Sequence, residues 1–229
     1  MSNEVTKLFE AEGGEFVTPP SLFATQLAKI KAVVFDWDGV FNDGFKNGTE
    51  GSIFSEVDAM GTNLLRYALW KMNAGLPKTA IITGEKNPSA QLLAEREHFD
   101  DVFFLSKNKG IAFASFCKKH SLKANEVLFF FDDVLDLEVA QQCGAKIMIG
   151  RHANPLLREF AKRAVAADYI TAHDGGRHGL REGCELVMGL LSLYDPVVKS
   201  RMVFSDAYQA YLEARQEIVT TVTNGIALN

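Results

Sequence analysis

The chain has 229 residues, of which 47% are hydrophobic and 23% are charged, the composition of an ordinary globular protein. Its formal net charge of −5 disfavours general nucleic-acid binding, which needs cations to neutralise phosphates. The longest apolar runs are too short to cross a bilayer, which argues against a membrane protein. The three cysteines form no CxxC pair and are odd in number, so we expect reduced thiols and a cytoplasmic location.

The sequence divides into a central region and two terminal extensions. Residues 1–30 are interpreted as an N-terminal extension that begins as loose polar chain and ends in a short helix capped by Ser21. Residues 31–193 are expected to form the core. Residues 194–229 are expected to form a C-terminal helical extension, because they carry mixed charges and little glycine.

Five short apolar runs alternate with segments of helical length, and this alternation predicts an α/β fold with a parallel sheet. Each run is continuous, as expected of a strand that is buried on both faces. Ligands bind beyond the carboxyl ends of such strands, so the residues after each run are the candidates for chemistry. The runs are residues 32–35, 79–82, 102–105, 127–131 and 146–149.

Residues 40–57 interrupt this alternation and are rich in Gly, Asn, Phe and Ser. Within them, Asn47-Gly48 is a strong signal for a tight hairpin turn. We therefore predict a β-hairpin flap that projects from the carboxyl end of the sheet. Phe41 and Phe45 on this flap are expected to pack between subunits.

Two aspartates, Asp36 and Asp38, follow the first strand and leave it facing the same way. Like charges that close repel each other, so a cation is expected to offset them. Carboxylate oxygens are ligands that suit Mg²⁺. Taken alone, a solvated turn explains the pair equally well.

The next two runs are followed by groups that suit a phosphate. Thr83 and Gly84 offer a hydroxyl and free backbone N–H groups where a helix opens, and Lys109 offers a positive charge at the entrance of the next helix. Taken singly, an N-cap role for Thr83 and a solvated surface position for Lys109 are the simpler interpretations.

Three more aspartates, Asp132, Asp133 and Asp136, follow the very apolar fourth run. A helix cap is the simpler interpretation of Asp133. Because Asp36 and Asp38 lie at the same end of the predicted sheet, so many acids without cations would be costly. Metal binding therefore explains the set better than separate structural roles do.

In this order, the four signals resemble the motifs of the haloacid dehalogenase-like (HAD) phosphohydrolase superfamily, which are Asp-x-Asp, Thr or Ser, Lys and an acidic pair. The resemblance covers about residues 31–190. It implies a HAD-like, Rossmannoid three-layer sandwich with helices on both faces of a parallel sheet.

The resemblance also implies roles for five residues. Asp36 would be the nucleophile that forms an aspartyl-phosphate. Asp38 would protonate the leaving alkoxide and then activate the hydrolytic water. Thr83, Gly84 and Lys109 would hold the phosphoryl oxygens.

The same resemblance implies a Mg²⁺ cofactor. Its ligands would be the Asp36 carboxylate, the Asp38 backbone carbonyl and Asp132. Asp133 and Asp136 would hold the groups around the metal. Phosphoryl transfer depends mostly on positioning and charge stabilisation, so this arrangement is chemically reasonable.

The spacing leaves no room for a separate cap domain. The interval from Asp36 to Thr83 is filled by the flap and one helix, and the interval from Thr83 to Asp132 by ordinary strands and helices. A capless site is open to solvent, so we expect either a large substrate or a neighbouring subunit that closes the site.

Two further stretches resemble the 3-deoxy-D-manno-octulosonate 8-phosphate (KDO 8-phosphate) phosphatase family. Residues 54–61 are similar to its Phe-x-Val-x-Asp-Gly-x-Gly pattern, and residues 175–182 are similar to its GGxGAxRE tail. This resemblance implies a homotetramer assembled through the hairpins, with tail residues near a neighbour's active site. Arg177 is therefore a candidate substrate contact.

Three positions depart from that pattern. Phe131 precedes the acidic motif where Gly is usual, and Ala59 replaces a Gly. Glu85 stands where an Arg is usual, and it is more similar to the related enzymes that act on 2-keto-3-deoxynononate (KDN) 9-phosphate. Glu85 is therefore a second candidate substrate contact.

Three hypotheses follow. The first is a Mg²⁺-dependent phosphatase whose partner is a small phosphorylated sugar acid, with KDO 8-phosphate as the first choice. The second keeps the chemistry and changes the substrate to a KDN or N-acylneuraminate 9-phosphate, as Glu85 favours. The third is a degenerate HAD-fold oligomerisation module, which Phe131 and the long C-terminal segment favour. The presence of every expected catalytic residue opposes the third hypothesis.

Overall fold

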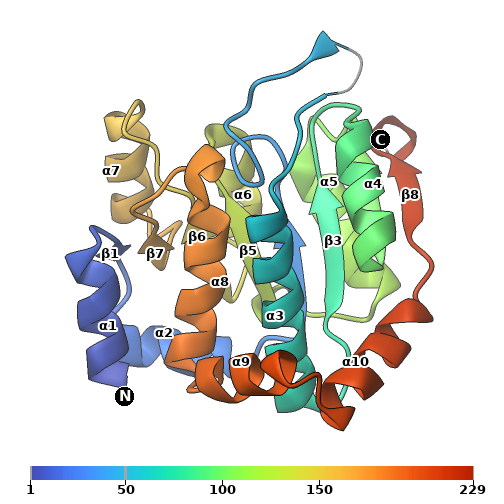
Figure 1. Cartoon of the computed structure of the whole chain (residues 1–229). Helices are drawn as coiled ribbons and strands as arrows, with labels where there is room; N and C mark the ends of the chain where they lie inside the picture. The colour runs from blue at the N-terminus through green and yellow to red at the C-terminus, as the bar shows by residue number, and fades with distance from the viewer. Residues whose placement is uncertain (1, 49–50, 229) are drawn as a thin grey trace.

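The computed structural model describes residues 2–48 and 51–228, and Figure 1 shows how they are arranged. The described strands form one eight-stranded sheet in the order β1-β7-β6-β5-β2-β3-β4-β8. β1 runs antiparallel to β7, and the other neighbouring pairs are parallel. The strands are β1 (Glu15–Phe16), β2 (Ala32–Phe35), β3 (Lys78–Ile82), β4 (Asp101–Phe104), β5 (Val127–Phe131), β6 (Ala145–Met148), β7 (Tyr169–Ile170) and β8 (Thr221–Asn224).

Helices cover both faces of this sheet. Within the described ranges, no helix is long and apolar enough to span a membrane. The α-helices are α1 (Ser2–Ala11), α2 (Pro20–Leu27), α3 (Glu56–Asn73), α4 (Pro88–Glu97), α5 (Lys109–Lys119), α6 (Leu137–Ala140), α7 (Pro155–Arg163), α8 (Gly179–Leu190), α9 (Tyr194–Met202) and α10 (Asp206–Gln216). Short 3₁₀ turns include η3 (Val134–Asp136), η4 (Gly175–Arg177) and η5 (Gly225–Leu228).

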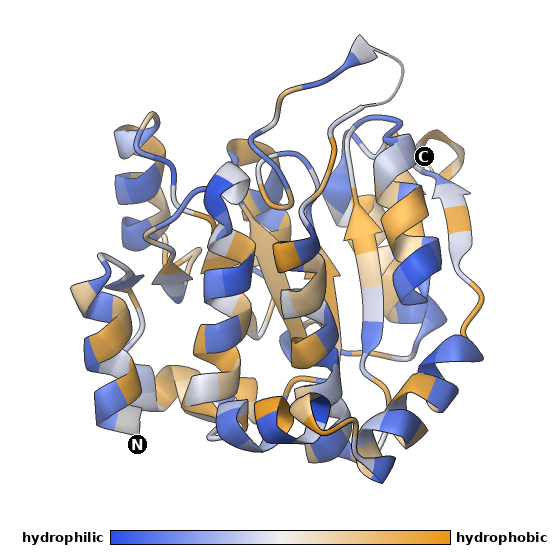
Figure 2. Ribbon diagram, in the orientation of Figure 1, coloured by the Kyte–Doolittle hydropathy of each residue, from blue (hydrophilic) through white to orange (hydrophobic). Residues whose placement is uncertain are grey.

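Alternate residues of the central strands pack into two separate hydrophobic clusters, one on each face of the sheet. In β5, Phe130 packs with residues of α3 and α8, whereas Phe129 and Phe131 pack with residues of α5, α6 and α7. All three phenylalanines are fully buried. A strand covered on both faces needs apolar side chains at every position, which explains the continuous runs. Figure 2 shows these strands as an apolar interior, and the predicted three-layer α/β sandwich is confirmed.

The N-terminal segment is ordered, and the expectation of a loose start is wrong. α1 packs Val5 and Phe9 against the core, and β1 pairs with β7 at one edge of the sheet. The next helix begins at Pro20, one residue before the predicted cap Ser21, and Pro19 takes the N-cap position. Proline suits the first helical position because its missing N–H has no partner to lose there.

The C-terminal segment contains two helices, α9 and α10, and also a strand that was not predicted. β8 pairs in parallel with β4, with Val222 opposite Val102. An open edge of a sheet exposes unpaired backbone groups, and β8 supplies them with partners. The terminal segments therefore provide both edge strands of the sheet.

The segment between β2 and α3 projects beyond the sheet as a loop (Figure 1). No strand is assigned in its described part, although the Asn47 N–H donates to the Gly51 carbonyl at 3.0 Å. The rest of the predicted hairpin turn, residues 49–50, lies outside the described residues. Phe41 is buried and stacks on Trp37 at 4.8 Å, so the expectation that it packs between subunits is wrong. Phe45 is 80% exposed on the loop.

The strand order places β2 between β5 and β3, at the centre of the sheet. Phe35 at the end of β2 is paired with Phe130 of β5 and with Ile81 of β3. Because these strands are parallel, the residues that follow them lie side by side at the carboxyl end of the sheet. No cap domain is inserted among the described residues, as the spacing predicted.

Candidate active site

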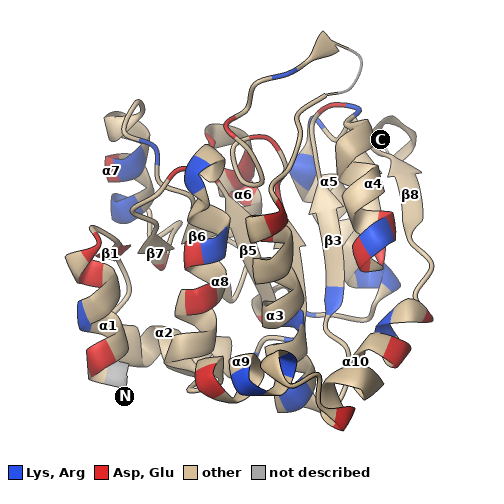
Figure 3. Ribbon diagram, in the orientation of Figure 1, with Lys and Arg blue, Asp and Glu red and all other residues tan. Residues whose placement is uncertain are grey.

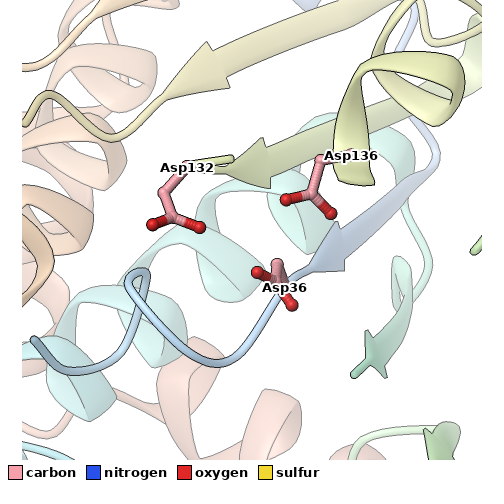
Figure 4. A group of neighbouring side chains, drawn as sticks. All are labelled: Asp36, Asp132 and Asp136. Carbon is pink, nitrogen blue, oxygen red and sulfur yellow. The ribbon is translucent and has the colours of Figure 1, made fainter. Parts of the chain in front are cut away.

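Three aspartates gather at the carboxyl end of the central strands. Asp36 follows β2, Asp132 follows β5, and Asp136 ends η3. One carboxylate oxygen from each lies within 4.8 Å of the others, and no side chain of the three is more than 7% exposed. Figure 4 shows the three carboxylates directed toward a shared space. The adjacency of β2 and β5 therefore unites acids that are far apart in the sequence.

Lys109, the first residue of α5, is buried against this acidic group. Its Nζ lies 2.6 Å from Asp36 Oδ1 and 2.5 Å from Asp136 Oδ1. Burial works against the charge of Lys109, but the two carboxylates hold its pKa above the usual lysine range. The structure thus contradicts the simpler interpretation of Lys109 as a solvated surface residue.

The acidic group carries more negative than positive charge. Burial, followed by the Asp36 and Asp136 charges, raises the pKa of Asp132 to about 8, although Arg151 opposes the shift. Burial and Asp36 likewise raise the pKa of Asp136. Three buried carboxylates that offer only oxygen donors fit a hard divalent cation such as Mg²⁺, whose charge would offset their repulsion.

Arg151 was not predicted as a site residue. It follows β6, and its Nη2 donates to Asp132 Oδ2 at 2.8 Å. Its position in the sequence could have indicated a site residue, because Arg151 lies just after the fifth apolar run, at the carboxyl end of a predicted strand. It was missed because no motif marks it.

Asp38 is not one of the three gathered acids, and its carboxylate is held by three groups. Ser52 Oγ donates to its Oδ1 at 2.5 Å, and Asn87 Nδ2 donates to its Oδ2 at 3.0 Å. Lys46 Nζ lies 3.2 Å from the same Oδ2. Ser52 and Lys46 both come from the projecting loop, so this loop orients the Asp38 carboxylate.

Asn87 links Asp38 to Thr83. Its Nδ2 also donates to Thr83 Oγ1 at 2.9 Å, and both Asn87 and Thr83 are fully buried. The side chain of Thr83 therefore faces Asn87, and it is the following Gly84 that reaches the cavity. Asn87 was missed because an Asn before Pro88 is the usual signature of a helix start.

A cavity of about 460 Å³ opens at this end of the sheet and collects most of the predicted site residues. Glu85 lines it, as does Lys107, which was not singled out. Arg177 does not line it and is exposed on η4. The predicted residues in its lining are Asp36, Asp38, Gly84, Glu85, Lys109, Asp132, Asp133 and Asp136.

Asp133 is exposed at the rim and acts as a helix cap. Its Oδ1 accepts from the Val134 N–H at 2.7 Å, and its own N–H donates to Asp136 Oδ2 at 3.3 Å. The simpler interpretation of Asp133 is thus correct at the level of its side chain. Its backbone nevertheless orients the Asp136 carboxylate.

The two family-like stretches, residues 54–61 and 175–182, lie against each other. Asp58 Oδ1 accepts from the Arg181 N–H at 3.0 Å, and His178 Nδ1 lies 3.2 Å from Asp58 Oδ2. Burial nevertheless raises the pKa of Asp58. A Cβ on Gly175 would collide with the carbonyl oxygens of the loop after Asp38, so glycine permits the close approach there. These stretches support the loop that carries Asp36 and Asp38.

Sequence comparison finds relatives among characterised phosphatases. A scan against models of known protein families finds no match. The chain is 32% identical, over 171 residues, to the 3-deoxy-D-manno-octulosonate 8-phosphate phosphatase KdsC of Salmonella typhi, covering 72% of this chain and 82% of the relative. It is 32% identical to the KdsC protein of Escherichia coli K12 over 166 residues, covering 69% and 79%.

Solved structures share the fold. A hydrolase assigned to HAD subfamily IIIA from Legionella pneumophila is 27% identical with a TM-score of 0.66, over 80% of this chain and 94% of that one. The KDO 8-phosphate phosphatase of Yersinia pestis is 25% identical with a TM-score of 0.60, over 76% and 89%. The Moraxella catarrhalis enzyme, solved with magnesium, phosphate and KDO, is 24% identical with a TM-score of 0.63, over 78% and 97%.

Proposed function

Because the chain belongs to the KDO 8-phosphate phosphatase family of the HAD superfamily, it is a phosphoric monoester hydrolase, and we propose that its substrate is a phosphorylated sugar acid. The first candidate is KDO 8-phosphate. The observation that carries the proposal is the placement of Asp36, buried between Lys109 and two further acids at the end of the central strand. The three free cysteines and the absence of a membrane-spanning helix among the described residues are compatible with a cytoplasmic setting.

In the proposed reaction, Asp36 attacks the phosphorus atom and the ester P–O bond breaks. The departing alkoxide takes a proton from Asp38, and an aspartyl-phosphate remains. A water molecule then gives a proton to Asp38 and attacks this phosphorus atom, which releases inorganic phosphate and restores Asp36. Ser52 and Asn87 keep the Asp38 carboxylate in a fixed position for both proton transfers.

The phosphoryl group is proposed to lie between Lys109 and the backbone at Gly84. Lys109 offers a buried ammonium that already contacts Asp36. Thr83 supports this position indirectly, because its hydroxyl accepts from Asn87. A charge in so dry a site stabilises a developing oxyanion more than it would in water.

A Mg²⁺ ion is the proposed cofactor, and Asp36, Asp132 and the Asp38 backbone carbonyl are its proposed ligands. The buried position of Asp136 beside Asp36 adds it to the residues that would hold the ion. When bound, such an ion neutralises charge on the transferring phosphoryl group. Arg151 holds the Asp132 carboxylate through Oδ2.

The choice between an eight-carbon and a nine-carbon sugar acid depends on the cavity wall beyond the phosphate. Glu85 lies in that wall and supports the nine-carbon alternative, because its carboxylate would accept from additional hydroxyl groups. Lys107 in the same wall suits the substrate carboxylate. Arg177 remains a candidate only if a neighbouring subunit presents it.

A homotetramer is the proposed assembly. Phe45 and Ile53 on the projecting loop are 80% and 71% exposed, and together they offer an apolar surface to a partner copy. A non-catalytic module, the remaining alternative, is disfavoured because the acids and Lys109 are present and in contact.

The test is phosphate release by the full chain with Mg²⁺, with and without a chelator. The panel contains KDO 8-phosphate, KDN 9-phosphate, N-acylneuraminate 9-phosphate, hexose phosphates and nucleotides. We expect chelator-sensitive turnover concentrated on one sugar acid. Turnover that favours nucleotides, or no turnover by folded protein, would overturn the proposed substrate class. Glu85→Arg should shift the preference toward KDO 8-phosphate if Glu85 selects the longer substrate.

A further inference from the structure

A second pocket, of about 240 Å³, lies away from the catalytic acids and is lined by three arginines. They come from three different helices: Arg96 from α4, Arg201 from α9 and Arg215 from α10, while the start of α3 completes the wall. Figure 3 shows charged residues of both signs on α4 and along the two C-terminal helices. None of the residues in this lining also lines the catalytic cavity.

The arginines outnumber the carboxylates that line the pocket, which are Glu56 and Glu97. Arg96 Nη1 pairs with Glu56 Oε1 at 2.5 Å, and Arg96 Nε pairs with Glu97 Oε1 at 3.1 Å. Arg215 Nη1 pairs with Glu97 Oε2 at 2.7 Å. Both acids are therefore already engaged by Arg96 and Arg215.

Arg201 is the arginine left without an acid. Its guanidinium lies over two aromatic rings, 5.0 Å from the centre of Tyr208 and 5.7 Å from the centre of Phe204. In the part of the chain that the structure describes, no carboxylate lies within ion-pair distance of it. Aromatic faces attract a guanidinium but leave its in-plane N–H groups available for an anion.

Two buried N–H donors at this pocket also lack partners. The Nε atoms of Arg201 and Arg215 are buried, and neither forms a hydrogen bond with any described residue. Buried donors are normally satisfied, so each such group calls for an acceptor that the chain itself does not provide.

The surroundings are electropositive as well. Arg66 is fully buried nearby, and its hydrogen bonds go to the backbone carbonyls of Glu97 and His98 rather than to a carboxylate. Burial lowers the pKa of Arg66, and the charge of Arg215 lowers it further. An additional anion would relieve this repulsion between guanidinium groups.

We propose that this pocket binds a small oxyanion, a phosphate or carboxylate group, through Arg201 and Arg215. Guanidinium groups bind both kinds of anion with paired N–H donors, which lysine cannot do. The pocket is smaller than the range of roughly 300–1,000 Å³ that is common for drug-sized ligands, so a single small anion suits it better than a nucleotide.

The test counts the phosphate ions that the full chain binds. Equilibrium dialysis with radiolabelled inorganic phosphate in the presence of Mg²⁺ should give two ions per wild-type chain at saturation, one in each site. Arg201→Gln should bind one, with affinity for the pocket reduced at least tenfold, and should keep phosphatase activity. Lys109→Gln should also bind one, because it loses the catalytic ion and retains the ion in the pocket.

Lys199→Gln is the matched control, because it removes one positive charge from the same helix at an exposed position, 3.8 Å from Asp195 and outside the pocket. It should bind two ions. If circular dichroism showed that Arg201→Gln is unfolded, Arg201→Lys would replace it. Weaker phosphate binding by Arg201→Lys, which keeps the positive charge, would support a role for the paired N–H donors of arginine.

Malonate competition identifies the preferred class. Displacement of the pocket phosphate by low malonate would assign the site to carboxylates, and resistance would assign it to phosphates. Equal phosphate binding by wild type and Arg201→Gln would overturn the proposal, as would a single site abolished by Lys109→Gln. If Arg201→Gln bound one ion as expected but Lys109→Gln still bound two, the result would count against the proposed catalytic site and not against the pocket.

Discussion

Lys109 and Asp36 form a buried ion pair at the carboxyl end of the central strands, with 2.6 Å between Nζ and Oδ1. The pair aligns the proposed nucleophile and places a positive charge where a phosphoryl group would be held. The contact forms because the end of β2 and the start of α5 lie at the same end of the parallel sheet. The predictions below follow from this arrangement and from the groups around it.

Asp36→Asn should abolish hydrolysis while the chain stays folded. The amide is nearly the same size as the carboxylate but is a very poor nucleophile, so the expected loss in kcat is at least about 10³-fold. Phosphate release and far-UV circular dichroism measure the two properties. Asp43→Asn, at an exposed position of the same loop, is the control and should retain activity. Substantial turnover by Asp36→Asn would rule out the nucleophile assignment.

Stability without metal should fall as the pH rises. The pKa of Asp132 is raised to about 8 in the folded chain, whereas an unfolded aspartate titrates near about 3.9. The stabilisation that protonated Asp132 contributes is therefore complete at low pH and is lost as the pH rises through the folded pKa.

Thermal unfolding in chelator, from pH 5 to 9, tests this dependence. Wild type should lose stability relative to Asp132→Asn across that range, because the amide does not titrate. Added Mg²⁺ should restore wild type most strongly at the upper end, where it competes with fewer protons. A constant difference between wild type and Asp132→Asn would show that Asp132 does not titrate in this window.

Asn87→Ala should lower kcat by about 10–100-fold with little change in KM, because the Asp38 carboxylate loses a donor that orients it. Asn154→Ala is a matched control. Asn154 also precedes a proline at a helix start, forms no side-chain cap and has an unpartnered Oδ1. Of the two asparagines, only Asn87 donates to Asp38 and Thr83. Equal kinetic effects of the two substitutions would show that Asn87 acts only through helix stability.

Gly39→Ala should damage the metal site. A Cβ at Gly39 would collide with the Asp132 carboxylate and with Arg151, and Gly39 also has φ of +86°. Gly44→Ala is the control, because Gly44 has φ of +84° but no atom within 4 Å of the added Cβ. Both variants should lose some stability, and only Gly39→Ala should show weakened Mg²⁺ binding by calorimetry. Identical Mg²⁺ affinities would contradict the predicted clash.

Phe130→Ala should destabilise the chain by about 3–5 kcal/mol, because it leaves a cavity between β5 and the helices α3 and α8. Phe45→Ala should change the free energy of unfolding of the isolated chain by less than about 0.5 kcal/mol, since Phe45 is 80% exposed. Urea unfolding measures both. A larger cost for Phe45→Ala than for Phe130→Ala in protein diluted to the monomer would contradict the exposed position of Phe45.

The order of strands and helices in the core was readable from the sequence because a doubly covered parallel strand requires an unbroken apolar run. Residues 127–131 illustrate this, since β5 has the predicted bounds. The edge strand β8 was not predicted, because its side chains are mostly exposed and polar, and its position depends on pairing with β4. Similarly, α1 was missed because its ordering comes from packing against the core.

The sequence by itself predicted that these acids and Lys109 follow successive strands, because a motif specifies residue types at the ends of strands. Tertiary structure alone decided their contacts. Only the adjacency of β2 and β5 could place Asp36 beside Asp132 and Asp136. The adjacency of β2 and β3 brings Asn87 to Asp38, and that of β5 and β6 brings Arg151 to Asp132. Hydrogen bonds between segments that are distant in the sequence form only where packing brings those segments together. No local sequence pattern specifies their separation in space.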